Sequence, residues 1–249
     1  MTRRSVLRNL YFFWVAIITV PMASGAVAYS GTQTNSYVYG VSPFTIPITV
    51  SGSNPVLVLH LEPNYGSNNA TAVSWSLGSG TAVNVATASY GNNYANVNTW
   101  CIPAPTAGSG TVSVTTATGV SAVWYDLELW TGASQTAPCP TGDAQTWISD
   151  GSSSTITLTP THLTTGDATA GNSGTCADDS NAMTPNSIVH YRGYPCDLDT
   201  GYAAGTTGIT ASFTGSTQGL NGAVAIRIVA ASSSTACTNL IALMGAGCQ

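Results

Sequence analysis

Residues 120–136 read Val-Ser-Ala-Val-Trp-Tyr-Asp-Leu-Glu-Leu-Trp-Thr-Gly-Ala-Ser-Gln-Thr. The stretch is rich in β-branched, aromatic and leucine residues, and it predicts a long strand. A period of two divides its side chains between two faces, with Val123, Tyr125, Leu127 and Leu129 on one and Trp124, Asp126, Glu128 and Trp130 on the other. Because a strand cannot bury an apolar face alone, we expect the rest of the chain to supply sheet that packs against it.

Short β-prone runs, broken by Gly, Ser, Asn and Pro, follow one another along the rest of the chain. The expected strands are 36–41, 44–50, 56–62, 72–77, 82–90, 95–102, 111–116, 122–131, 144–148, 155–159, 187–191, 210–214 and 223–229. This spacing predicts an all-β fold, namely a single large antiparallel β-sandwich of jelly-roll or immunoglobulin-like type, with long polar loops and disulfides. Strands 56–62 and 223–229 are apolar on nearly both faces, so we expect them to be central. Residues 164–187 carry no strand pattern and predict a long loop.

The N-terminal segment has the composition of a secretory signal. Arg3, Arg4 and Arg8 precede an apolar run from Leu10 to Met22, and a small-x-small cleavage site follows at residues 26–28. We therefore expect residues 1–28 to be a signal peptide. An uncleaved membrane anchor stays open, because the apolar stretch is only just short of the roughly 20 residues that a span needs. The expected mature chain is a sandwich domain at 29–231, followed by a disulfide-closed tail at 232–249.

Charge limits the partners of the mature chain. It keeps Arg192 and Arg227 against ten acidic residues and has no lysine. A net charge of about −8 without a basic cluster argues against nucleic acid and, after signal cleavage, against anionic membrane surfaces as partners. The charged fraction of the whole chain is 6%, well below the roughly 25% of ordinary soluble domains. Solubility therefore depends on hydroxyl and amide groups.

All six cysteines lie after the expected signal peptide, at Cys101, Cys139, Cys176, Cys196, Cys237 and Cys248. An even number of cysteines in an exported chain predicts disulfides, and six allow fifteen pairings. We favour the sequential set. In this set Cys101 joins Cys139 across two strand ends, Cys176 joins Cys196 around the polar loop, and Cys237 joins Cys248 in the tail. No cysteine or histidine spacing indicates a zinc site.

The region from Trp100 to Pro138 resembles β-sandwich modules of bacterial secreted proteins and phage-associated proteins. In these modules an aromatic-x-x-x-Pro segment leads into a Gly-x-x-x-Val-x-Val strand, and a later strand ends in an aromatic-Ser-Gly-x-Asp-Gln-Thr-x-Pro corner. The matching residues here are 100–105, 110–114 and 130–138, with the alanine-rich strand 222–228 as the closing strand. Ser134 stands where the modules have Asp. The resemblance implies a jelly-roll-like or immunoglobulin-like sandwich and no activity.

Two acids between two tryptophans form the sharpest candidate site. Residues two apart on a strand point the same way, about 6–7 Å apart, which would put Asp126 and Glu128 side by side between Trp124 and Trp130. Indole faces stack on sugars and carboxylates accept bonds from sugar hydroxyls, so the four residues are candidates for binding a carbohydrate. The alternative is structural, with Trp130 capping the core and the two acids at a solvated rim.

The same strand resembles the Glu-x-Asp-x-Glu strand of laminarinase-like jelly-roll hydrolases, which implies a retaining glycosidase with one carboxylate as nucleophile and the other as acid/base. Trp124 stands where the first Glu of that motif belongs. We therefore assign no catalytic residue and expect a chain that is not an enzyme.

Other polar residues predict turns and core positions. Asp178, Asp179, Asp197 and Asp199 could gather oxygen ligands for calcium, but solvated turn acids explain them better, and we expect neither a metal nor a cofactor. His60 lies in an apolar strand, which predicts a core histidine with a satisfied ring. His162 and His190 have no metal-site spacing.

We therefore expect a secreted, non-enzymatic surface protein for adhesion or extracellular assembly, whose partners are an extracellular glycan or other copies of itself. A carbohydrate-binding module and a jelly-roll glycoside hydrolase are the alternatives.

Overall fold

The computed structural model describes residues 26–40, 42–64, 70–90, 95–118, 120, 122–149, 153–160, 166–175, 182–184, 186–191, 196–203, 209–214 and 221–232. These residues belong to one compact unit that spans Ser24–Ser234. Apart from one short 3-10 turn, the regular elements of the described part are all strands, so the all-β prediction is confirmed. The expected signal peptide and C-terminal tail lie outside the described residues, except for 26–28 and 232.

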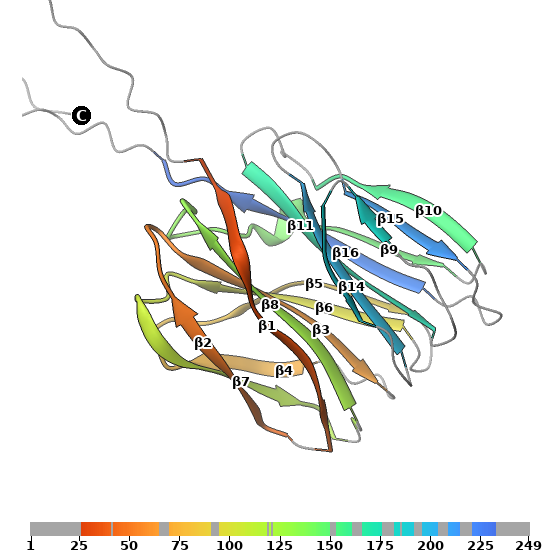
Figure 1. The fold of residues 1–249 in the computed structure, drawn as a ribbon, viewed down its shortest axis with the longest axis horizontal. Coiled ribbons are helices and arrows are strands. Elements are labelled where there is room, and N and C mark those ends of the chain that lie inside the picture. Colours follow the sequence, from red (N-terminus) through yellow and green to blue (C-terminus); the bar gives the residue numbers. More distant parts are fainter. Residues whose placement is uncertain are drawn as a thin grey trace, which may run out of the picture. The chain divides into compact units, whose positions relative to one another are not determined.

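The strands form four antiparallel sheets (Figure 1). In chain order they are β1 (Ala28–Tyr39), β2 (Phe44–Val50), β3 (Val56–Asn64), β4 (Ala70–Trp75), β5 (Val83–Tyr90), β6 (Ala95–Pro103), β7 (Gly108–Thr116), β8 (Ala122–Thr131), β9 (Gln145–Ser149), β10 (Ser153–Leu158), β11 (Gly166–Thr175), β12 (Ala182–Thr184), β13 (Asn186–Tyr191), β14 (Cys196–Ala203), β15 (Ile209–Thr214) and β16 (Asn221–Val229). The 3-10 turn is η1 (Thr141–Asp143).

The same strand order occurs twice along the chain. The first eight strands form the sheets β1-β8-β3-β6-β5 and β2-β7-β4. The next eight form β9-β16-β11-β14-β13 and β10-β15-β12, which is the first pattern with eight added to each number. We call β1–β8 the first module and β9–β16 the second module. The described residues therefore form four sheets in two sets, where the sequence predicts a single large antiparallel β-sandwich.

The first sheet of the first module contributes to a core cluster on each of its faces. One core cluster joins it to the β2-β7-β4 sheet through alternating apolar residues such as Ile46, Leu59 and Leu127. A second cluster joins its other face to the second module, and it includes Val56, Val58, Val97 and Trp130 from the first module with Val224, Ile226 and Ile228 from β16. β3 lies between β6 and β8, and β16 lies between β9 and β11, so the prediction that these two strands are central is confirmed.

Residues 164–187, which sequence analysis assigns to a loop, contain β11 and β12. β11 pairs with β14 on one side and with β16 on the other. Its sequence, Gly-Asp-Ala-Thr-Ala-Gly-Asn-Ser-Gly-Thr, has no apolar alternation. Backbone pairing on both edges therefore defines this strand, and the loop prediction is wrong for these residues.

The connection between the modules is attached at several points. Residues 132–144 follow β8, and within them the amide of Ser134 donates to the Val229 carbonyl at 2.7 Å. The amide of Val229 donates in turn to the Pro138 carbonyl at 2.8 Å. Gly132 has a φ of +71°, a left-handed conformation that favours glycine. These bonds tie the connection to the end of β16.

One disulfide strengthens this connection. Cys101 on β6 is bonded to Cys139, with the two Cα atoms 6.3 Å apart, which confirms that predicted pair. The bond ties the connecting segment back to the first module. Cys176, Cys237 and Cys248 lie outside the described residues, as does the side chain of Cys196, so the other two pairs stay predictions.

Candidate functional site

Strand β8 lies between β1 and β3, and its side chains alternate as predicted. Val123, Tyr125, Leu127 and Leu129 belong to the first core cluster. Trp124, Asp126, Glu128 and Trp130 lie on the other face of the strand, and none of the four is more than 3% exposed. Both acids have an exposure of 0%, so the alternative that placed them at a solvated rim is wrong. The four side chains do not form an open surface.

Glu128 has one partner on its own strand and one on the neighbouring strand β3. The indole Nε1 of Trp130 donates to its Oε2 at 2.7 Å. Nε2 of His60, on β3, lies 3.4 Å from its Oε1, and the other ring nitrogen of His60 is 3.0 Å from the hydroxyl of Thr99 on β6. Because His60 is fully buried and both of its nitrogens have polar neighbours, the prediction of a satisfied core histidine is confirmed.

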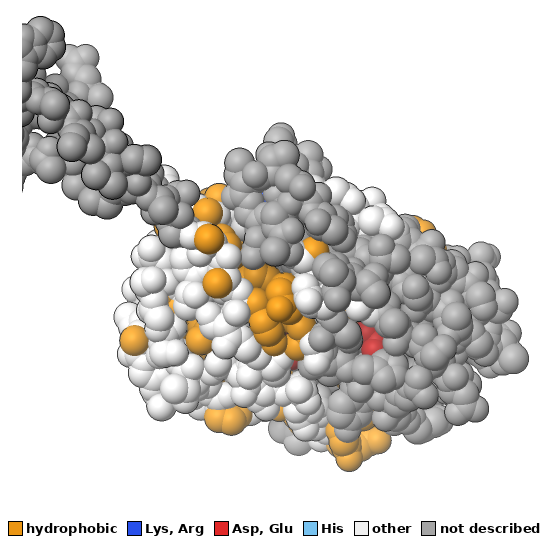
Figure 2. Space-filling model, turned by 45° about the horizontal axis from the view of Figure 1, so that its top comes forward, with side chains coloured by type: hydrophobic (Ala, Val, Ile, Leu, Met, Phe, Trp, Pro, Cys, Tyr) orange, Lys and Arg blue, Asp and Glu red, His pale blue; other side chains and the backbone are white. Residues whose placement is uncertain are grey.

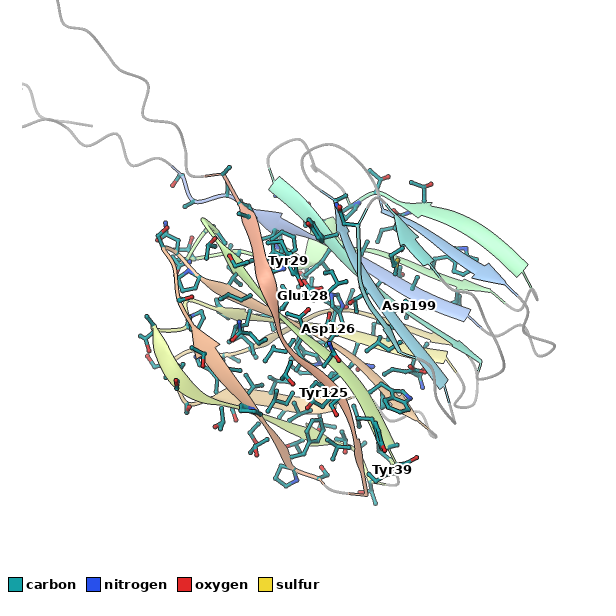
Figure 3. All side chains as sticks on the ribbon, viewed as in Figure 1. Tyr29, Tyr39, Tyr125, Asp126, Glu128 and Asp199 are labelled. Carbon is teal, nitrogen blue, oxygen red and sulfur yellow. A yellow bond between two sulfur atoms is a disulfide. The ribbon has the colours of Figure 1, made fainter. Side chains whose placement is uncertain are left out.

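Asp126 contacts the second module. The hydroxyl of Thr200, on β14, donates to its Oδ2 at 2.6 Å. The other carboxylate oxygen, Oδ1, has no hydrogen bond of good geometry among the described residues. Burial and the nearby Glu128 raise the pKa of Asp126 to about 7, while Thr200, His60 and Thr32 lower it by less. Asp126 therefore changes its charge near neutral pH. Figure 3 shows Asp126 and Glu128 in succession along β8.

Three aromatic rings lie beside the acids. Tyr29 on β1 stacks on Tyr202 of β14 with ring centroids 4.6 Å apart, and it meets Trp130 at 5.4 Å. Tyr202 and Trp130 also meet edge to face at 5.8 Å. Burial raises the pKa of Tyr29 to about 12, with smaller contributions from Glu128 and Asp126. We call Asp126, Glu128, His60, Thr99 and Thr200 the acid cluster, and Tyr29, Trp130 and Tyr202 its aromatic border.

Of the four calcium candidates, Asp199 is the one whose side chain lies in the described part of the chain. Asp199 lies within β14 at 1% exposure, so for this residue the prediction of a solvated turn acid is wrong. Asp178, Asp179 and the side chain of Asp197 lie outside the described residues, as do His162 and the side chain of His190. In the described part of the chain, no group of three or more His, Cys, Asp or Glu side chains could hold a metal ion.

Sequence reasoning missed the residues that cover the acids. Thr200 and Tyr202 lie in β14. The sequence of β14 contains Asp, Thr and Gly residues that are typical of turns, so it does not predict a strand. Tyr29 lies before the first expected strand, at the start of the longer strand β1. For His60 a signal was present, because it shares the face of Val56 and Val58 in an apolar strand. Only the strand register, which sets His60 opposite Asp126, shows that this histidine lies beside the acids of β8.

No protein-family model, curated protein or solved structure matches the chain. Among the described residues there is also no helix with the length and apolar character needed to cross a membrane.

Proposed function

We propose that this chain is a secreted, non-enzymatic surface or structural protein that acts in adhesion or extracellular assembly. The observation that carries the proposal is the complete burial of Asp126 and Glu128 beneath the second module. A glycosidase needs both carboxylates in a cleft that admits a sugar and water. An acid pair enclosed between two sheets instead has the setting of a polar core, so the jelly-roll hydrolase alternative has less support.

We also propose that each module is a jelly-roll β-sandwich. In the first module β1 pairs with β8, β2 with β7 and β3 with β6, which is the pairing obtained when a long antiparallel hairpin is wrapped into two sheets. The second module repeats it with β9 and β16, β10 and β15, and β11 and β14. Jelly rolls serve both in shells and in lectins, so the fold does not choose between assembly and sugar binding.

The surface is consistent with an exported protein. On the face drawn in Figure 2, no Lys or Arg side chain is visible among the described residues, and acidic side chains appear at few places. Val27, before the expected cleavage point, is 8% exposed and belongs to the second core cluster. Cleavage before this residue would keep that contact, and N-terminal sequencing of the exported protein would locate the cut.

Two assays test the proposed function. In sedimentation velocity over a wide concentration range, the wild-type chain should self-associate, and a monomer at every concentration would contradict the assembly form. In hydrolysis assays on β-glucans the wild-type chain should be inactive. Hydrolysis that Glu128→Gln abolishes, in a variant that still folds, would overturn the non-enzymatic assignment.

Carbohydrate binding stays the second candidate, at a different place from the predicted one. Tyr37 and Tyr39 on β1 are 41% and 56% exposed, with ring centroids 5.1 Å apart. Tyr37 also packs on buried Trp124 at 4.4 Å, which supports its ring. If this pair binds sugars, a glycan array should give signals that Tyr39→Ala removes and that Val83→Ala, another exposed apolar position, leaves unchanged. An array without signals would exclude this candidate.

A further inference from the structure

We propose that the acid cluster is a proton-operated latch between the two modules, which holds them together more tightly when it takes up a proton. The inference concerns the stability of the chain and does not depend on the proposed adhesive or assembly function. It rests on the position of the cluster, because its acids lie on β8 of the first module and Thr200 reaches them from β14 of the second.

The cluster holds two acids and one base, all three with no exposure to solvent. Asp126 and Glu128 are both fully buried on one face of β8, and His60 is the base beside them. The two carboxylates lie two residues apart on one face of the same strand at 0% exposure, so ionising both would place two like charges side by side away from solvent. A buried charge of this kind is costly, and the usual response is that one acid keeps its proton.

The groups that face Asp126 come from four strands, namely Glu128 on β8, His60 on β3, Tyr29 and Thr32 on β1, and Thr200 and Tyr202 on β14. Glu62 is a further buried acid, two residues from His60 on the same face of β3 and opposite Trp124. β16 contributes Val224, Ile226 and Ile228 to the same interface. Arg227 alternates with these residues, so it lies on the opposite face of β16, where it pairs with Asp143. Among the described residues, β16 therefore brings no arginine to the face that meets the acids.

The direction of the effect follows from the pKa of Asp126. Burial and Glu128 raise it from 3.8 to about 7 in the folded chain. The folded state therefore binds this proton more tightly than the unfolded state does. The resulting stabilisation is fully present below about pH 4 and is lost as the pH rises through about 7. Between these values the chain should become more stable on acidification.

Urea unfolding of the full chain, followed by tryptophan fluorescence at a series of pH values, tests the latch. From pH 5 to pH 8 the unfolding constant of the wild-type chain should increase about ten- to a hundredfold. Asp126→Asn should remove most of this change, because its side chain has the same shape and does not titrate. A wild-type constant that is flat or falls over this range would overturn the proposal, as would an Asp126→Asn variant with the wild-type pH dependence.

Two further measurements keep the test independent of the folding of Asp126→Asn. Thr200→Val removes a hydroxyl that lowers the pKa of Asp126, so the pH-dependent change should move to higher pH. Thr45→Val, at an exposed position on β2, is the matched control and should leave the pH of this change unaltered. A carbon-13 NMR titration of the wild-type side-chain carboxyls should show one aspartate with a midpoint near 7. Midpoints below about 5 for every aspartate would overturn the latch.

Discussion

Arg227→Met should lower the free energy of unfolding at pH 7 by about 3–5 kcal/mol, the cost of removing one partner of a buried ion pair. Nη2 of Arg227 lies 2.7 Å from Oδ2 of Asp143, and both side chains are 10% exposed. Arg227 is on β16 and Asp143 is in η1, within the connection between the modules. The substitution therefore leaves a buried carboxylate without its cation at the place where the connection meets the second module. Urea unfolding gives the measurement.

The matched control for this prediction removes both charges. Replacing a buried ion pair by apolar residues of similar size is often neutral or stabilising, so Arg227→Met combined with Asp143→Leu should recover most of the lost stability. If the single variant is as stable as the wild-type chain, or if the double variant is less stable than the single one, the pair does not anchor the connection.

Trp130→Ala should cost a similar amount, about 3–5 kcal/mol, because it empties a large fully buried site. Trp130 is 0% exposed, belongs to the cluster that joins the two modules, and donates a hydrogen bond to Glu128. Its removal also leaves a carboxylate oxygen of Glu128 without that donor, which adds to the cost. Thermal and urea unfolding should both show the loss.

Trp75 is the control for this substitution. It lies on β4 at the first core cluster, is only partly buried and is remote from the module interface. Trp75→Ala should therefore destabilise the chain less than Trp130→Ala does. Equal losses for the two variants would mean that Trp130 has no special place at the interface.

The alternation of β8 could be predicted from the sequence, but the exposure of its polar face could not. The period of two in residues 122–131 and in residues 44–50 predicts β8 and β2 with their observed bounds. The sheet that covers Asp126 and Glu128 is built partly from β11 and β14, whose sequences are rich in Gly, Thr and Asp. Hydrophobic periodicity does not reveal such strands. The sequence therefore gives no sign that another sheet covers the polar face of β8.

The repeated strand order of the two modules could not be predicted from the sequence either, for a related reason. The two modules share the order of their strands, while the residues at their interface differ. β8 contributes Asp126, Glu128 and Trp130 where β16 contributes Val224, Ile226 and Ile228. The repeat is one of strand pairing over about a hundred residues, and strand pairing depends on contacts distant in sequence.

The packing of the two modules through these faces is the claim on which the rest depends, and a double-mutant cycle between Asp126 and Thr200 tests it most directly. The cycle compares Asp126→Ala, Thr200→Val and the double variant by urea unfolding at pH 8. A hydrogen bond to a buried carboxylate predicts a coupling free energy of about 1–3 kcal/mol. Losses that add to within about 0.3 kcal/mol, as expected for distant sites, would contradict the account.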